Sequence, residues 1–291
     1  FKNLKSKQSH QKNWSKSVFE VYKDASINLE WTEKLKEECE KCGIIFFTSP
    51  YDLDLIDQID NFIPAYKIGS GEITYLDLIK KVASKNKPYI LATGASNMTE
   101  IERAVEAGIT INKNLLIMQC NTNYTADSNN FKYINLNVLK TFKKKFPHLL
   151  LGLSDHTPGH ATALGAIALG VSAIEKHFTD DNLRKGPDHF FSMNPTTWKD
   201  MTLRSRELET SLGEEEKKIE KNELETIILQ RRAIRAKKDL KQGEKISNEN
   251  IIPLRPCPES GILPFEKEKI LNKKINRDIV QGDYIGWDDL I

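Results

Sequence analysis

Short apolar runs alternate with longer amphipathic stretches over residues 29–212. The apolar runs are Ile44–Phe47, Tyr66–Ile68, Tyr89–Leu91, Leu115–Met118, Leu149–Leu153 and Val171–Ile174. The amphipathic stretches are Thr74–Ser84, Met98–Ala107, Ile134–Phe146, His160–Leu169 and Pro195–Leu212. Short buried strands that alternate with helices are typical of parallel βαβ units. The pattern therefore predicts an α/β fold, either a (β/α)₈ barrel or a doubly wound sheet.

Polar residues follow most of the apolar runs, and their distribution favours the barrel. They are Thr48-Ser49-Pro50, Ser70-Gly71-Glu72, Thr93-Gly94, Asn121–Tyr124, Ser154-Asp155-His156 and Lys176-His177. Barrel enzymes place chemistry at the carboxyl ends of many strands, whereas a doubly wound sheet gathers its ligand at one switch point. The sequence also has no G-x-G-x-x-G or Walker A loop. We predict a (β/α)₈ TIM-type barrel that lacks its first strands, because only about six of the eight strands of that fold are recognisable.

The composition changes after residue 212. Residues 213–228 are highly charged and predict a linker or an exposed helix. Residues 229–291 contain short β-like runs, with turns at Gln242-Gly243-Glu244 and Gln281-Gly282-Asp283. We therefore expect an incomplete barrel over 1–212, a linker over 213–228 and a small, mostly-β domain over 229–291. A domain of about 60 residues has little core of its own, so we expect it to pack on something larger.

Charge and hydropathy exclude few classes of protein, but they favour an ordinary globular protein. Lys and Arg number 43 and Asp and Glu 41, which gives a formal net charge of +2. This balance gives no basis for a nucleic-acid partner or a membrane surface. Hydrophobic residues make up 39% of the chain, and no apolar run approaches the ~20 residues that a membrane span needs.

Four cysteines, Cys39, Cys42, Cys120 and Cys257, are too few for a disulfide framework in 291 residues. They indicate a reducing compartment, so we expect a cytoplasmic protein. Cys39 and Cys42 form one C-x-x-C, which is either half a zinc site or two unpaired thiols. Because no second C-x-x-C follows, we favour unpaired thiols at the end of a charged helix that Gly43 caps.

His156 and His177 each end an apolar run, in Gly-Leu-Ser-Asp-His and Ile-Glu-Lys-His. If both runs are barrel strands, the two imidazoles reach the same mouth, with Asp155 and Glu175 nearby. Two neutral imidazoles can hold a divalent metal and leave positions open for water and substrate. The alternative is a pair of unrelated histidines that only donate hydrogen bonds. Their equivalent positions in adjacent units favour the metal.

The segment Tyr66-Lys-Ile-Gly-Ser-Gly-Glu72 carries a candidate anion site. Lys67 lies inside a predicted strand, where an ammonium is costly to bury unless it meets an anion. The two glycines leave room for backbone amides to approach a phosphate or carboxylate, and Ser70 adds a hydroxyl. Glu72 then places a carboxylate in the same mouth, able to accept a proton. The alternative is a plain turn with an exposed lysine.

Further polar residues are weaker candidates when each is taken alone. Thr122 and Ser154 supply hydroxyls after two strands, and together with the lysine they make an anion pocket. Asp188 follows a Gly-Pro turn and either binds sugar hydroxyls or caps the turn. Tyr124 is a platform, a hydroxyl donor or a packing residue. Arg255 lies on a strand-like segment of the small domain and by itself reads as a surface charge.

The ordered set of motifs resembles the N-acetylneuraminate (sialic acid) synthase family. In the barrel region the motifs are Pro64–Glu72, Leu91–Gly94, Cys120–Tyr124, Gly152–Thr157, Glu175–Thr179 and Gly186–Asp188. The C-terminal motifs Arg231–Ala236, Asp239–Glu244 and Leu254–Pro256 resemble that family's antifreeze-like (SAF) domain, a small β-clip. The resemblance covers nearly the whole chain, in order and with the expected spacing.

The resemblance implies a condensation of phosphoenolpyruvate with the open-chain form of an N-acetylmannosamine-type sugar. C3 of phosphoenolpyruvate attacks the aldehyde, water adds at C2, and phosphate leaves with C–O cleavage. A Mn²⁺ or Mg²⁺ ion held by His156 and His177 polarises the aldehyde. The residues implied to bind phosphoenolpyruvate are Thr48, Lys67, Ser70, Thr122 and Ser154.

The resemblance also assigns the remaining candidates. Glu72, Tyr124 and Asp188 fall where the family binds the sugar or transfers protons, so Glu72 joins the two histidines as a catalytic candidate. Arg255 fits an arginine that reaches the N-acetyl group from the partner subunit of a domain-swapped homodimer. That arrangement would dock the small domain on the partner's barrel.

Two alternatives remain open at this point. Sister synthases make pseudaminic or legionaminic acid from other acetamido sugars, and Gly-Pro-Asp-His favours the sialic or legionaminic side. The second alternative is an inactive sugar-binding relic without the first two strands. In the family those strands carry a glutamate and a Lys-x-Gln pair that help bind substrate; this sequence starts just after that point, so we name no residues for them.

Overall fold

The chain forms two compact units, Phe1–Gly213 and Glu214–Ile291, which are described separately. The computed structural model describes residues 16–124, 127–186 and 188–291. The two units meet after Leu212, the last residue of a long helix, where Gly213 adopts a φ of 54°. A positive φ favours glycine, so the helix ends at a residue suited to that change of direction.

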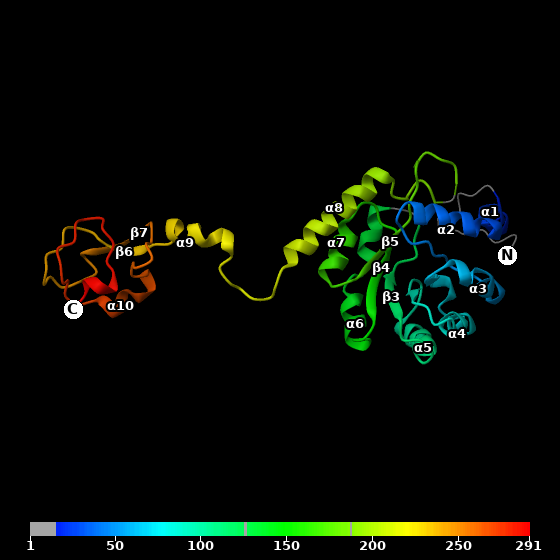
Figure 1. Cartoon of the computed structure of the whole chain (residues 1–291), viewed down its shortest axis with the longest axis horizontal. Coiled ribbons are helices and arrows are strands. Elements are labelled where there is room, and N and C mark those ends of the chain that lie inside the picture. Colours follow the sequence, from blue (N-terminus) through cyan, green and yellow to red (C-terminus); the bar gives the residue numbers. More distant parts are fainter. Residues whose placement is uncertain (1–15, 125–126, 187) are drawn as a thin grey trace. The chain divides into compact units, whose positions relative to one another are not determined.

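The larger unit is built on a five-stranded parallel sheet (Figure 1). Its strands, in spatial as well as chain order, are β1 (Tyr66–Ile68), β2 (Tyr89–Ala92), β3 (Leu115–Cys120), β4 (Leu150–Asp155) and β5 (Ala173–Lys176). Five of the six predicted runs are confirmed as strands, although β5 begins two positions later than expected. Strands that follow one another around a sheet in chain order are what a (β/α)₈ barrel contains.

The prediction of a strand over Ile44–Phe47 is wrong. In this region only Thr48 pairs with the sheet, through an isolated parallel bridge to Tyr66. Ile44 and Ile45 are 60% and 72% exposed, so this apolar run is not covered as a buried strand would be. A strand requires a hydrogen-bonded neighbour, and here the pairing is limited to one residue beside β1.

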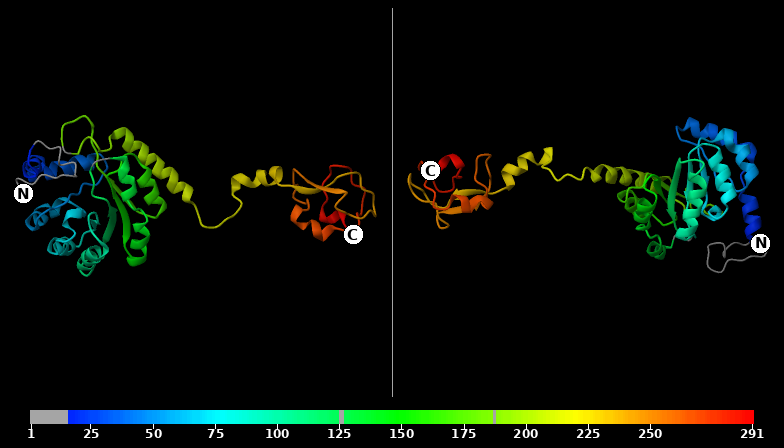
Figure 2. Two further views of the ribbon diagram at one scale, coloured as in Figure 1. Left: turned by 180° about the vertical axis from the view of Figure 1, so that it is seen from behind. Right: turned by 90° about the horizontal axis from the view of Figure 1, so that it is seen from below.

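The α-helices between successive strands pack along one face of the sheet (Figure 2). They are α4 (Leu76–Ser84), α5 (Met98–Ile109), α6 (Val138–Lys145) and α7 (Ala161–Ala168). Before β1 come α1 (Val18–Ala25), α2 (Thr32–Lys41) and α3 (Leu53–Ile59), and after β5 comes α8 (Pro195–Leu212), which packs on α7. Local sequence explains their ends. Asn97 and Glu100 form a capping box at the start of α5, and Gly43 follows α2 with a φ of 68°.

The two faces of the sheet have different chemistry, because side chains alternate along each strand. Toward the helices lie buried apolar residues such as Ile68, Leu91, Ile117 and Leu153, which share one core with Phe142 of α6. Burial of each such side chain contributes roughly 1.5–3 kcal/mol. The residues between them, which face away from the helices, include the candidates Lys67 and Ser154.

One contact shows that the sheet is strongly curved. β1 and β5 are the outermost strands, yet Nζ of Lys67 on β1 lies 3.2 Å from Oε2 of Glu175 on β5. In a flat sheet with about 4.8 Å between strands, the outer two of five would lie roughly 19 Å apart. The face opposite the helices is therefore concave, and the sheet is half of a barrel wall.

The smaller unit contains a two-stranded antiparallel sheet of β6 (Ala233–Ala236) and β7 (Ile251–Leu254). Its helices are α9 (Leu224–Gln230) and α10 (Lys267–Ile270). Isoleucines form most of its compact core. Gly243 and Gly282 adopt φ values of 83° and 88°, which confirms the two turns expected from the sequence.

All four cysteines are unpaired thiols, as predicted. Cys120 and Cys257 are buried, whereas Cys42 is exposed. Within residues 16–124, 127–186 and 188–291, no helix combines the length and the apolar character that a bilayer crossing requires.

Candidate active site

The loops after β1, β2 and β3 bring three small groups together around Gly94. The backbone N–H of Gly94 donates to Oγ of Ser70 over 2.9 Å. A Cβ at Gly94 would lie 1.9 Å from Oγ1 of Thr122, 2.9 Å from Oγ of Ser70 and 3.0 Å from Sγ of Cys120. A side chain at this position would force these groups to shift, so the glycine leaves room for the two predicted hydroxyls beside its backbone.

A second group joins the two outer strands of the sheet across the concave face. Lys67 is 8% exposed, and its ammonium contacts the carboxylate of Glu175. Ser154 on β4 donates from Oγ to Oε1 of the same carboxylate over 2.8 Å. Lys67 and Ser154 were both predicted anion ligands, and the structure places them on one carboxylate. The pocket can therefore hold a carboxylate or phosphate oxygen with an ammonium and a hydroxyl.

His156 and His177 lie side by side where β4 and β5 end, with ring centroids 5.2 Å apart. Nδ1 of His156 lies 3.1 Å from the carbonyl oxygen of Asn121, and a carbonyl only accepts hydrogen bonds. Nδ1 of His177 lies 3.5 Å from Oδ2 of Asp188. Both Nδ1 atoms thus face oxygen acceptors, which favours a proton on Nδ1 and a lone pair on Nε2.

The electrostatic setting keeps His156 uncharged. Its side chain is buried, and desolvation, followed by the nearby imidazole of His177, lowers its pKa from 6.5 to about 4. The ring is neutral near pH 7 and keeps an Nε2 lone pair. A neutral imidazole whose other nitrogen donates to an oxygen is the usual form of a metal-binding histidine.

These observations show that the two imidazoles fit a divalent cation. Among the described residues no cluster of three or more His, Cys, Asp or Glu side chains that could hold a metal is present. The protein's share of such a site is therefore two nitrogens, and the remaining positions would be open to water and substrate oxygens.

Tyr124 packs edge-on against both imidazoles. Its ring centroid lies 4.3 Å from that of His156 and 5.5 Å from that of His177. Burial raises the pKa of its hydroxyl, so the group stays protonated. Phe191 also packs on His177, at 5.0 Å between centroids, and lies 5.9 Å from the Tyr124 ring. Aromatic packing therefore fixes the planes of the rings while Asp188 and Asn121 fix their nitrogens.

Glu72 and Thr48 lie at the β1 side of the mouth. Glu72 ends a short 3₁₀ turn, Ser70–Glu72. Desolvation, followed by the negative charge of Glu72 and more weakly that of Glu175, raises the pKa of the Tyr51 hydroxyl. Thr48 accepts a 3.3 Å hydrogen bond at its carbonyl from the Lys67 amide. Thr48 is thus adjacent to the lysine through its backbone.

Arg255 belongs to the smaller unit and is described within that unit. Its Nε donates to the carbonyl oxygen of Gln230 over 2.6 Å. The N–H of Cys257 donates to the carbonyl oxygen of Ile228 over 2.8 Å. These bonds close the C-terminal end of α9 and fix the loop that carries the exposed guanidinium. Pro187, the second residue of the expected Gly-Pro turn before Asp188, lies outside the described residues.

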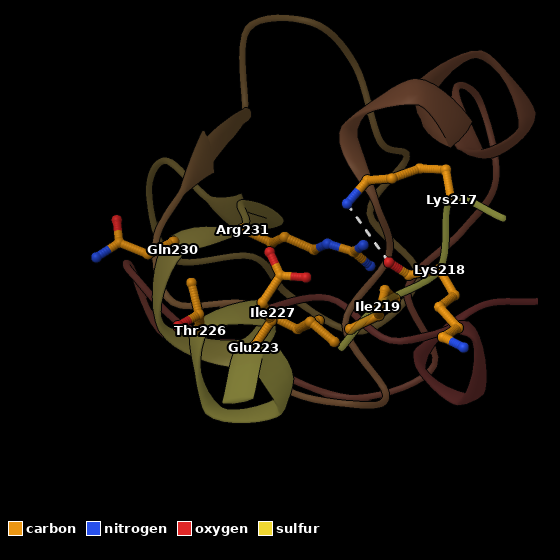
Figure 3. A pocket seen from close by; sticks show the side chains of 8 residues that line it. All are labelled: Lys217, Lys218, Ile219, Glu223, Thr226, Ile227, Gln230 and Arg231. Carbon is orange, nitrogen blue, oxygen red and sulfur yellow. Dashed lines mark hydrogen bonds between the residues drawn. The ribbon is translucent and has the colours of Figure 1, made fainter. Parts of the chain in front are cut away.

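The smaller unit also has a hollow of about 510 Å³ (Figure 3). It is lined by Lys217, Lys218, Ile219, Glu223, Thr226, Ile227, Gln230 and Arg231. None of these is a predicted site residue, and the charged groups around it are mostly exposed. The chemistry of the chain therefore centres on the concave face of the sheet and not on this hollow.

Three residues near the mouth had no assigned role in the sequence interpretation. Glu175 joins Lys67 and Ser154, and Asp155 and Lys176 form a buried ion pair behind the histidines. Strand alternation could have identified Glu175, because it lies two residues before His177 and so shares its face. The Asp155–Lys176 contact depends on the β4–β5 register, which the sequence does not specify.

Comparison with known families shows which family the two units resemble. A model described as the NeuB family matches residues 2–217, and a SAF domain model matches residues 231–291. The first match covers more than half of the chain and contains the whole concave face. The second contains Arg255 and both turns of the smaller unit.

Individual relatives show the same relationship. The chain is 34% identical to the N,N'-diacetyllegionaminic acid synthase of Campylobacter jejuni, over 92% of this chain and 80% of that protein. It is 33% identical to the pseudaminic acid synthase of Helicobacter pylori, over 95% and 81%. A crystal structure of the N-acetylneuraminic acid synthetase of Leptospira borgpetersenii superposes with a TM-score of 0.66 at 27% identity, covering 72% of each chain.

Proposed function

Because this chain belongs to the NeuB family and ends in a SAF domain, we propose that it is a nonulosonate synthase. In this proposal it condenses phosphoenolpyruvate with an N-acetylmannosamine-type sugar to give N-acetylneuraminate and phosphate. The observation that carries the proposal is the common concave face, on which an ammonium-lined anion pocket and a pair of imidazoles lie together.

The anion pocket is suited to phosphoenolpyruvate. The Lys67 ammonium, with the hydroxyls of Ser70, Thr122 and Ser154, would bind its carboxylate and phosphate oxygens. Ammonium and hydroxyl donors to an anion form short, charge-assisted hydrogen bonds. The entering anion would compete with Glu175 for Lys67. Fixing one substrate in this way removes much of the entropic barrier to a two-substrate reaction.

The bonds formed and broken balance without a further reactant. C3 of phosphoenolpyruvate forms a bond to the aldehyde carbon of the sugar, and the aldehyde oxygen takes up a proton. Water adds at C2 and loses a proton, and the C2–O bond breaks as phosphate leaves. Glu72 is the proposed proton acceptor, since it lies in the same short turn after β1 as Ser70.

A divalent cation, Mn²⁺ or Mg²⁺, is part of the proposal. Nε2 of His156 and Nε2 of His177 would hold it, because their Nδ1 atoms face Asn121 and Asp188. When bound, such a cation supplies a Lewis acid beside the aldehyde. Tyr124 and Asp188 would contact the sugar from the same side as the imidazoles.

The remaining sugar contact is proposed to come from a second copy. Arg255 would reach the N-acetyl group from the partner subunit of a domain-swapped homodimer. Its guanidinium is exposed, and its Nε is fixed on Gln230, which leaves the outer nitrogens for a ligand. The unpaired cysteines fit a reducing compartment, so we place the enzyme in the cytoplasm.

A second candidate substrate is supported by the identity to bacterial relatives. The N,N'-diacetyllegionaminic acid synthase of Campylobacter jejuni and the pseudaminic acid synthase of Helicobacter pylori are 34% and 33% identical to this chain. A diacetylated sugar of either type is therefore the alternative to N-acetylmannosamine.

The test is phosphate release from phosphoenolpyruvate with each of these sugars, before and after removal of divalent metal. We expect release to require one sugar and a metal, and ¹⁸O in the bridging position of phosphoenolpyruvate to appear in phosphate. Activity that survives complete chelation would contradict the metal assignment. Phosphate release without ¹⁸O would contradict C–O cleavage, and no release with any sugar would support the inactive relic.

A further inference from the structure

Behind the two histidines, the ends of β4 and β5 are joined by successive cross-strand contacts. Ser154 pairs with Glu175 in the strand register, and the next pair is Asp155 with Lys176. The first pair shares a hydrogen bond on the concave face, and the second forms an ion pair of 2.5 Å on the helix face. His156 and His177 come next on each strand, so their spacing is set by the contacts immediately before them.

The ion pair is among the most deeply buried polar groups of the described chain. Asp155 is 2% exposed and Lys176 is 8% exposed. The carboxylate also accepts from the amide and hydroxyl of Thr157 and, over 2.6 Å, from Thr162 at the start of α7. Every charge is thereby matched by short hydrogen bonds, as a buried ion pair requires.

The decisive feature is how Lys176 contacts β4 on both sides of His156. Its Nζ donates to Oδ2 of Asp155, the residue before the histidine, over 2.5 Å. The same Nζ donates to the carbonyl oxygen of Thr157, the residue after it, over 2.7 Å. Lys176 itself directly precedes His177. One ammonium therefore binds the side chain of the residue before His156 and the backbone carbonyl of the residue after it, and it belongs to the residue that precedes His177.

Stability alone is a weak reason for this arrangement. Desolvation of two charges offsets most of their attraction, so a buried ion pair is on balance no more stabilising than apolar residues of similar volume. What such a pair does supply is geometry. A one-residue slip of either strand would turn the imidazole that follows that strand away from the concave face, and the ion pair opposes such a slip.

We infer that Asp155 and Lys176 are positioning residues, which hold Nε2 of His156 and Nε2 of His177 at the separation that one divalent cation needs. The inference rests on the proposed function, because it assigns the cation to the imidazole pair. In this inference Asp155 and Lys176 do not contact the substrate. Supports behind metal ligands typically change metal affinity by 10- to 100-fold.

The chain offers a matched control at the opposite end of the sheet. Asp60 and Lys87, near the amino ends of β1 and β2, form an ion pair of 2.9 Å, and Asp60 also accepts from the Tyr66 hydroxyl over 2.7 Å. Asp→Asn with Lys→Met removes the charges of either pair and keeps an acceptor for the neighbouring hydroxyl. The two double variants remove the same charges at opposite ends of the sheet, although the control pair is more exposed, with side chains 28% and 25% exposed against 2% and 0%.

The experiment measures Mn²⁺ binding to the full chain by electron paramagnetic resonance, with folding followed by circular dichroism and urea unfolding. We expect D155N/K176M to weaken Mn²⁺ binding by at least tenfold and D60N/K87M to leave it within twofold of the wild type. A folded D155N/K176M protein with wild-type Mn²⁺ affinity would overturn the inference, as would equal weakening in both double variants.

A milder variant covers the case in which D155N/K176M does not fold. Asp155→Asn alone keeps the shape and the acceptor for Thr162, and we expect it to weaken Mn²⁺ binding several-fold; unchanged affinity counts against positioning. A wild-type chain that binds no Mn²⁺ would instead refute the metal assignment of the proposed function, and the inference with it. Normal wild-type binding combined with insensitive variants refutes the inference alone.

Discussion

The two ends of the parallel sheet treat their polar groups in opposite ways. At the amino ends of the strands, the Tyr66 hydroxyl donates to Asp60, the Tyr89 hydroxyl donates to the carbonyl oxygen of Asn112, and Lys87 donates to that of Ile63. Each of these groups is satisfied by the protein itself. Burial raises the pKa of Tyr89 to about 12, so its hydroxyl serves only as a neutral donor.

At the carboxyl ends the polar groups lie close together but keep hydrogen-bonding capacity for a ligand. Lys67 shares its ammonium with a partly exposed carboxylate, and the two imidazoles direct their Nδ1 atoms at oxygen acceptors. In the part of the chain that the structure describes, no hydrogen bond to either Nε2 atom is formed. The polar groups at the amino end therefore contribute to stability, whereas those at the carboxyl end are available to a ligand, which is the usual division in a barrel.

The largest expected effect comes from the histidines. His156→Ala and His177→Ala should each reduce the rate of phosphate release by about 10³-fold. A Lewis acid lowers the activation barrier by several kcal/mol, and about 1.4 kcal/mol corresponds to a tenfold change in rate. Both variants should remain folded, since neither imidazole is part of the apolar core. Steady-state kinetics with saturating Mn²⁺ measures the loss. A variant that releases phosphate within tenfold of the wild-type rate would contradict the assignment of the active site to the carboxyl ends of the strands.

The acid stability of the metal-free protein should depend on His156. Its pKa is about 4 when folded and 6.5 in the unfolded chain, so between these values the unfolded state binds a proton that the folded state does not. The free energy of unfolding should therefore fall by roughly 3 kcal/mol as the pH drops from 6.5 to 4, at about 1.4 kcal/mol per pH unit.

Urea unfolding in chelator at several pH values measures this dependence. His156→Gln removes the titrating group while it keeps a polar side chain, so its unfolding free energy should change less over the same interval. Parallel curves for the variant and the wild type would show that the buried imidazole is not the source.

Two lysines sharpen the comparison of the two ends directly. Lys67→Met should lower kcat/KM for phosphoenolpyruvate by about 10²-fold through loss of a charge-assisted contact, with little change in unfolding. Lys87→Met should leave kinetics unchanged and lower the free energy of unfolding by about 1–2 kcal/mol, since it leaves backbone acceptors unpaired. The reverse pattern would contradict the division between the two ends.

A smaller effect is expected from a single methyl group in the anion pocket. Gly94→Ala places a Cβ on the Thr122 hydroxyl and should raise KM for phosphoenolpyruvate about tenfold, with a stability loss of about 1–3 kcal/mol from overpacking. Gly71→Ala is the control in the neighbouring loop, because its Cβ would meet nothing within 4 Å. Equal kinetics for the two variants would show that the pocket is not where phosphoenolpyruvate binds.

The sequence predicted the parts of the site that repeat with the strands. Lys67, Ser154 and the two histidines follow from strand alternation, and the structure brings them to one face. The ion pair of Asp155 with Lys176 could not be predicted, because it depends on the register of two strands far apart in sequence. The error at Ile44–Phe47 has a similar cause, since an apolar run becomes a strand only where a neighbour pairs with it.

The most direct test of the account is the protonation of the two imidazoles in the metal-free chain at pH 7. Long-range ¹H–¹⁵N correlation spectra distinguish the ring nitrogens, and His156→Gln and His177→Gln assign the signals. The account predicts a proton on Nδ1 and a lone pair on Nε2 for both histidines, with both Nε2 signals shifting when a diamagnetic divalent cation is added. A proton on Nε2 of either ring, or no response to the cation, would contradict it.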